Sequence, residues 1–192
     1  MDYEFSKLIH FIKHHSKEII IALILVILAT IVVILFVDNY GKKSASYYDA
    51  LGDLADNKHN LNGAENYYKK AIGIDPNIAD AYMGLGGIYY EKGDYNLELL
   101  NYRKATTLDP KNSDDLYYLA TAFEDNSNYK DAIATYEEAL KLKPDNKDAL
   151  HDLGILYLTQ GEYSKAENLV SRLILLDSGW GEELRMLINK MK

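Results

Sequence analysis

The chain has 192 residues, a formal net charge of −8 and no cysteine. The lack of cysteine excludes disulfides, thiolate metal sites and cysteine nucleophiles. Residues 44–192 carry 16 Lys and Arg against 25 Asp and Glu, so nucleic acid, whose phosphates require a basic surface, is not expected as a partner.

Residues 1–18 are expected to form a short amphipathic segment at a membrane interface. One face carries apolar residues at i, i+3, i+4 and i+7, namely Phe5, Leu8, Ile9 and Ile12. The other face carries basic and imidazole side chains, of which the lysines suit lipid phosphates, namely Lys7, His10, His14 and Lys17. The pattern also fits the start of one long helix that continues into the next segment, and both interpretations stay open.

Residues 19–37 are expected to form a transmembrane helix in contact with lipid. The run has no charged residue, and as a helix it spans roughly 28 Å, close to the thickness of a bilayer core. A cleaved signal peptide is the alternative. Its apolar stretch is shorter, however, and it precedes a small-residue cleavage site, whereas this run ends in Phe36 and Val37.

The flanking charges indicate an orientation. Three lysines precede the apolar run, and two follow it in a linker expected at 38–44. The positive-inside rule therefore favours, by one lysine, an N-terminus in the cytoplasm. This predicts a single-pass protein of a prokaryotic cytoplasmic membrane, with the rest of the chain outside the cytoplasm.

Residues 45–180 are expected to form stacked repeats of 34 residues. The only three prolines follow Asp75, Asp109 and Lys143 at a constant spacing of 34. Because proline stops a helix and disfavours helical geometry in the residue before it, each proline marks the end of a unit. The units are 45–78, 79–112, 113–146 and 147–180. Stacked units of this kind bind partners more often than they catalyse.

Each unit predicts two helices joined by a turn. The first helix has bulky apolar residues at positions 4, 7 and 11 and a small residue at position 8, where a neighbouring helix approaches closely. In the third unit these are Leu116, Leu119, Phe123 and Ala120. Gly or Asn in the turn supplies the left-handed residue that ends this helix. The second helix then alternates small and large residues, as in Ala132, Tyr136 and Ala139.

This pattern resembles the tetratricopeptide repeat (TPR), and the resemblance covers residues 45–180. It implies an all-α fold in which four helix-turn-helix repeats form a right-handed superhelical solenoid, here preceded by the transmembrane helix. Glu98 departs from the pattern because it replaces the small residue expected at position 20. Residues 181–192 are expected to form a short cap helix with an apolar face of Leu184, Leu187, Ile188 and Met191.

The resemblance also implies a partner-binding groove, lined in this family by positions 2, 5, 9, 12 and 13 of each first helix. Across the four units these positions hold nine acidic residues and no Lys or Arg. The acidic average of the domain is an alternative cause of this bias, but 16 basic residues are available in residues 44–192 and all fall elsewhere. The predicted groove residues are Asp49, Asp53, Asp80, Met83, Tyr90, Asp114, Tyr117, Thr121, Glu124, Asp148, His151 and Ile155.

An acidic groove predicts a basic or mixed basic-apolar protein segment as the partner. Tyr90 and Tyr117 offer aromatic faces to Arg or Lys, while Ile155 and Leu158 make the fourth unit apolar. The acidic tails bound by carboxylate-clamp members of the family would be repelled. Self-association through the repeats is a further possibility.

No catalytic, cofactor-binding or metal-binding motif is found, so an enzyme is not expected. The predicted function is a membrane-anchored scaffold whose groove captures a segment of a partner protein, similar to bacterial adaptors of the translocon and of envelope chaperones. Two alternatives stay open. One is an accessory or tethering subunit of a membrane enzyme or secretion complex, and the other is an N-anchored import receptor that faces the cytosol.

Overall fold

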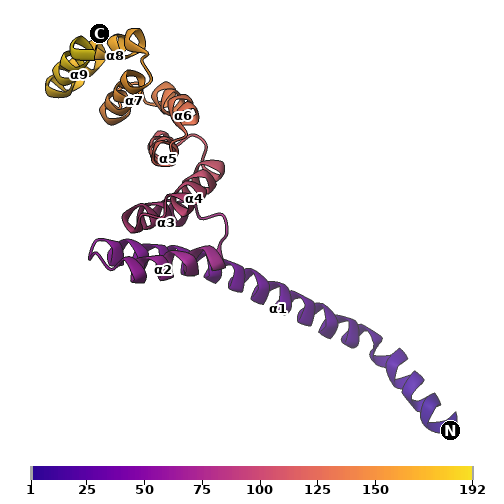
Figure 1. Ribbon diagram of the computed structural model, residues 1–192. Coiled ribbons are helices and arrows are strands. Elements are labelled where there is room, and N and C mark those ends of the chain that lie inside the picture. The colour runs from indigo at the N-terminus through magenta and orange to yellow at the C-terminus, as the bar shows by residue number, and fades with distance from the viewer. Residues whose placement is uncertain (1, 192) are drawn as a thin grey trace. The chain divides into compact units, whose positions relative to one another are not determined.

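The described residues 2–191 of the computed structural model form nine α-helices and no strand (Figure 1). The side chains of residues 2, 8, 9, 11, 12, 15, 16, 19 and 35–44 lie outside the described set, as do residues 1 and 192. The all-α prediction is therefore correct for the described residues. Contacts between residues divide the chain into two units, Met1–Ser44 and Ala45–Lys192.

The predicted transmembrane segment is corrected by the structure. Residues 19–37 lie within α1 (Asp2–Asp56), and among the described residues no helix combines the length and the apolarity needed to cross a membrane. The predictions of a transmembrane helix, of lipid contact through residues 19–37 and of a single-pass location are therefore not supported.

Two further expectations concern the same helix. Residues 38–44, predicted as a linker, belong to α1. Of the predicted amphipathic face, Phe5 is exposed, whereas the side chains of Leu8, Ile9 and Ile12 lie outside the described residues.

The second unit is a series of helices in which each packs against the next from α2 to α9 (Figure 1). These helices are α2 (Leu61–Ile74), α3 (Ala79–Lys92), α4 (Tyr95–Leu108), α5 (Ser113–Asp125), α6 (Tyr129–Leu142), α7 (Lys147–Thr159), α8 (Tyr163–Leu176) and α9 (Ser178–Met191).

The turns inside the helix pairs use a left-handed residue, but not always the expected one. Gly93 and Gly161 have φ of 73° and 75°. Where no glycine is present, His59 and Ser127 take this conformation, at 55° and 58°. The asparagine that follows His59 instead caps α2, because its side chain accepts a hydrogen bond from the Gly63 N–H.

The core consists of the large side chains that the repeat pattern predicts, interlocked with small ones. Tyr68, Tyr136 and Leu153 are at most 2% exposed. The ring of Tyr102 lies so close to Gly86 that a Cβ atom at that position would come within 2.3 Å of it. This close approach explains why position 8 of the repeat holds a small residue.

The C-terminal helix begins before the expected residue 181. The Asp177 side chain accepts hydrogen bonds from the N–H groups of Gly179 and Trp180, which starts α9 at Ser178. Leu184 and Ile188 are buried, while Met191 remains 47% exposed. The helix packs against both α7 and α8, so it covers the end of the stack.

Candidate functional site

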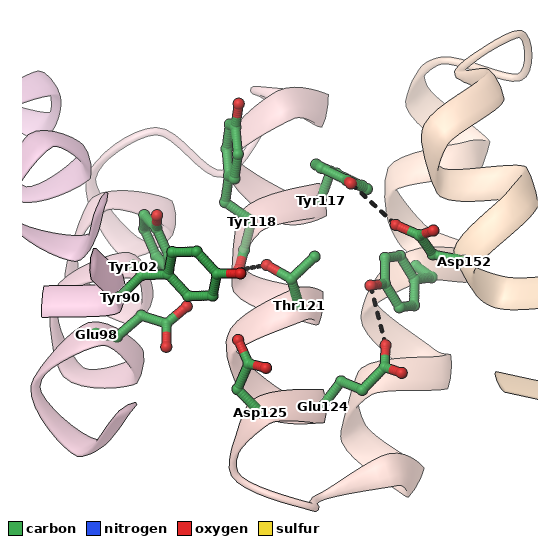
Figure 2. A pocket seen from close by; sticks show the side chains of 10 residues that line it. Tyr90, Glu98, Tyr102, Tyr117, Tyr118, Thr121, Glu124, Asp125 and Asp152 are labelled. Carbon is green, nitrogen blue, oxygen red and sulfur yellow. Dashed lines mark hydrogen bonds between the residues drawn. The ribbon is translucent and has the colours of Figure 1, made fainter. Parts of the chain in front are cut away.

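A pocket of about 460 Å³ opens among five consecutive helices, α3 to α7 (Figure 2). The helix α5 supplies half of its lining, because residues four and seven or eight apart share one face of a helix. Its complete lining is Tyr90, Glu98, Tyr102, Tyr117, Tyr118, Thr121, Glu124, Asp125, Tyr136 and Asp152.

Tyrosines form much of the pocket wall. The rings of Tyr102 from α4 and Tyr118 from α5 stack with centroids 5.7 Å apart and planes 25° apart. The Tyr117 hydroxyl donates a hydrogen bond to Asp152 at 2.9 Å, and the Tyr136 hydroxyl donates one to Glu124 at 3.3 Å (Figure 2). These two bonds join α5 to α7 and α5 to α6, which fixes the shape of the wall.

The pocket is acidic throughout. Four of its ten described lining residues are carboxylates, and none is Lys, Arg or His. Burial raises the pKa of Glu98 to about 7, and the nearby charge of Asp125 adds to this shift. Burial also raises the pKa values of Glu124 and Asp125. Glu98, Glu124 and Asp125 are therefore partly desolvated, and none of the described lining residues is a base that would offset their charge.

Glu98 is the most buried of these groups. Its side chain is 1% exposed, and its Oε2 atom has no hydrogen-bond partner among the described residues. Figure 2 shows its carboxylate pointing from α4 toward the side of the pocket where Asp125 lies on α5. A buried ionisable group normally has a partner, so this one has unused binding capacity.

The structure brings four of the twelve predicted groove residues into the pocket: Tyr90, Thr121, Tyr117 and Glu124. Three others, Asp49, Asp53 and Asp80, form a second acidic group in the N-terminal part of Ala45–Lys192. The negative charges of Asp53 and Asp80, after the larger effect of burial, raise the pKa of Asp49 to about 6. Asp53 also accepts a hydrogen bond from the Tyr68 hydroxyl at 2.8 Å.

The remaining predicted groove residues lie outside both groups. Asp148 is exposed, and Asp114 is exposed and pairs with Lys143. Met83 and Ile155 are partly buried and pack against the core.

The fourth unit offers less of the expected apolar surface. Leu158 is 2% exposed and belongs to the core. The ring of His151 lies 4.7 Å from that of Trp180, and its Nδ1 atom lies 3.0 Å from Asp152. Trp180, the last residue of the predicted fourth unit, lies on α9 and covers part of the predicted groove. The repeat pattern assigns no role to an aromatic residue at this position.

Six lining residues are not among the twelve predicted ones, for different reasons. Asp125 occupies position 13, one of the family's groove positions. Tyr102 and Tyr136 occupy position 24, where an aromatic residue is read as core. Tyr118 and Asp152 occupy position 6, which is outside the family's usual groove positions. Glu98 did carry a detectable signal, because it breaks the small-residue rule at position 20.

Three family models, each described as Tetratricopeptide repeat, match residues 50–113, 101–134 and 123–191. The chain carries tetratricopeptide repeats. A crystal structure of MamA protein is 25% identical, with a TM-score of 0.67, over 78% of this chain and 86% of that chain. A search of curated proteins finds no match.

Two other TPR structures extend the comparison. The TPR domain of Arabidopsis OM64 is 28% identical, with a TM-score of 0.54, over 57% of this chain and 90% of that chain. YrrB, described as a TPR protein with an unusual peptide-binding site, is 21% identical, with a TM-score of 0.65, over 76% of this chain and 84% of that chain. At that identity YrrB shows a shared fold. TPR proteins of this kind are protein-interaction scaffolds.

Proposed function

We propose that this TPR scaffold captures a basic, extended segment of a partner protein in the pocket between α3 and α7. The observation that carries the proposal is the pocket lining, which combines four carboxylates and five tyrosines with no basic residue among them. Carboxylates attract Lys and Arg, and tyrosine faces bind the same cations through their π-systems. A peptide-binding site described for the structural neighbour YrrB is compatible with this use of the fold.

The pocket geometry suits a peptide better than a compact surface. Its volume of about 460 Å³ admits a few side chains, and the tyrosine-carboxylate hydrogen bonds preform its wall. Preformed walls reduce the ordering cost of binding. Such capture fits an adaptor of a translocon or chaperone as well as an accessory subunit of an enzyme complex, and identification of the co-purified partner distinguishes these roles.

The direct test reverses one charge inside the pocket and one outside it. Asp125 is exposed and lines the pocket, whereas Glu138 is exposed on α6 and does not line it. Asp125→Lys and Glu138→Lys change the net charge equally. With the full chain and a fluorescein-labelled peptide of mixed Arg, Lys and Ser, Asp125→Lys should weaken binding about three- to tenfold, and Glu138→Lys should have little effect.

Added salt should weaken the binding of the wild type, because partly exposed charges are screened. Equal binding by the two variants, or equal affinity of the wild type for an acidic peptide of the same length, would refute capture of a basic segment by this pocket.

A further inference from the structure

Glu98 occupies a buried repeat position at which close helix packing favours a small residue. In the other three repeats the corresponding residue is alanine, at 0% exposure in each case: Ala64, Ala132 and Ala166. Replacing alanine by glutamate at a buried site costs stability unless the carboxylate has a partner. The Oε2 atom of Glu98 has none among the described residues, and the side chain lines the pocket.

No described residue neutralises Glu98 from the elements packed around it. The other titratable groups of the pocket on α3, α4 and α5 are tyrosines and acids, of which Tyr90, Tyr102, Tyr118 and Asp125 lie on the Glu98 side. Asp125 repels the ionised form of Glu98 rather than stabilising it. The missing element of this site is therefore a cation that comes from outside the chain.

The surroundings of Glu98 favour a planar cation of low hydration. A carboxylate that is 1% exposed can be reached only by a group that gives up its water. A guanidinium is more weakly hydrated than an ammonium, and its fork of N–H donors matches carboxylate oxygens. It also stacks on aromatic faces, and the Tyr102 ring lies close enough to Glu98 and Asp125 for their charges to raise its pKa.

We infer that the pocket is an arginine-specific subsite, in which one arginine of the captured segment places its guanidinium between Glu98 and Asp125 and against the neighbouring tyrosine rings. This inference rests on the proposed function and adds to it the identity of the side chain that the pocket selects. Arginine is preferred over lysine because the deepest ligand, Glu98, is almost fully withdrawn from water.

A thermodynamic cycle tests the subsite. One arm of the cycle compares the wild-type chain with Glu98→Gln, which keeps the side-chain shape and removes the charge. The other arm compares labelled peptides of alternating Arg and Ser with counterparts in which every Arg is Lys or citrulline. Glu138→Gln, on the exposed face of α6, is the matched control for net charge.

The wild type and Glu138→Gln should bind the arginine peptide about tenfold more tightly than the lysine peptide, and the citrulline peptide should bind worst. Glu98→Gln should lose most of this preference, so that its affinities for the arginine and lysine peptides approach each other. If Glu98→Gln retains the full preference, or if the wild type has none, the arginine subsite is refuted while capture of basic segments stands. If no basic peptide binds the wild type, the proposed function itself fails.

Discussion

The second and third helix pairs use the same position of the repeat in opposite ways. In the α5–α6 pair, position 20 is Ala132, which is completely buried and lets the helices pack closely. In the α3–α4 pair it is Glu98, which is equally buried but ionisable, and whose Oε2 atom has no hydrogen-bond partner among the described residues. The same repeat position thus holds either a small side chain that lets two helices pack closely or a carboxylate that lines a pocket. The buried carboxylate lowers the stability of the fold.

The largest loss of stability should come from placing a glutamate at position 20 of the α5–α6 pair, as in the α3–α4 pair. Ala132→Glu places a carboxylate at a site with 0% exposure that is packed within the core. We expect the free energy of unfolding to fall by about 3 to 5 kcal/mol, because the new group is both oversized and unpaired. Urea unfolding of the full chain measures the change, and a loss below about 1 kcal/mol would mean that the two positions are equivalent.

Packing in the middle of the stack should matter more than packing at its end. Leu119 is 7% exposed in α5, whereas Leu187 is only partly buried on α9. Leu119→Ala should lower the free energy of unfolding by about 2 to 4 kcal/mol. Leu187→Ala should cost roughly half of that or less, since a partly buried side chain leaves a smaller cavity. Equal losses in urea unfolding would contradict this difference between the interior and the end.

Glu98 itself should reduce stability at high pH. Because its pKa is raised to about 7 in the folded state, the folded chain binds more protons than the unfolded chain between the ordinary glutamate pKa and about 7. The contribution of Glu98 to stability therefore falls as the pH rises through this window. Glu98→Gln does not titrate, so it should be more stable than the wild type by about 2 kcal/mol near pH 8 and by much less near pH 5.

Asp49 and Asp115 also have pKa values raised to about 6, mainly by burial. Both remain in the variant, so the difference between the wild type and Glu98→Gln isolates Glu98. A difference in stability that does not change with pH would show that Glu98 has an ordinary pKa.

The smallest predicted effect concerns binding. A cation in the pocket favours ionised carboxylates, so affinity for the arginine peptide should rise as Glu98, Glu124 and Asp125 lose their protons. We expect a gain of about three- to tenfold in the wild type between roughly pH 6 and pH 8, and a smaller gain in Glu98→Gln. Fluorescence polarisation at constant ionic strength measures it, and the two proteins should differ in this slope if Glu98 contacts the peptide.

The sequence predicts correctly the features that depend on the residues of a single helix pair. Helix-forming repeats and core positions such as Leu119 and Tyr136 follow from local periodicity. The pocket is different, because it joins side chains from five helices, and position 6 residues such as Tyr118 enter it through packing between units. The length and lack of charge of the apolar run at 19–37 predict a membrane span, but no described helix is long and apolar enough to cross a membrane. His59 and Ser127 show a similar limit, since their left-handed geometry comes from turns that lack glycine.

The central claim is that Glu98 is a buried carboxylate that binds a cation of another molecule. Carbon-13 NMR of the side-chain carboxyl groups, with Glu98→Gln used to assign the resonance, tests it most directly. The account predicts that the Glu98 carboxyl titrates with a pKa of about 7 in the free chain, and that the arginine peptide lowers this value by about one unit or more. An ordinary glutamate pKa in the free chain, or a raised pKa that the arginine peptide leaves unchanged, would contradict it.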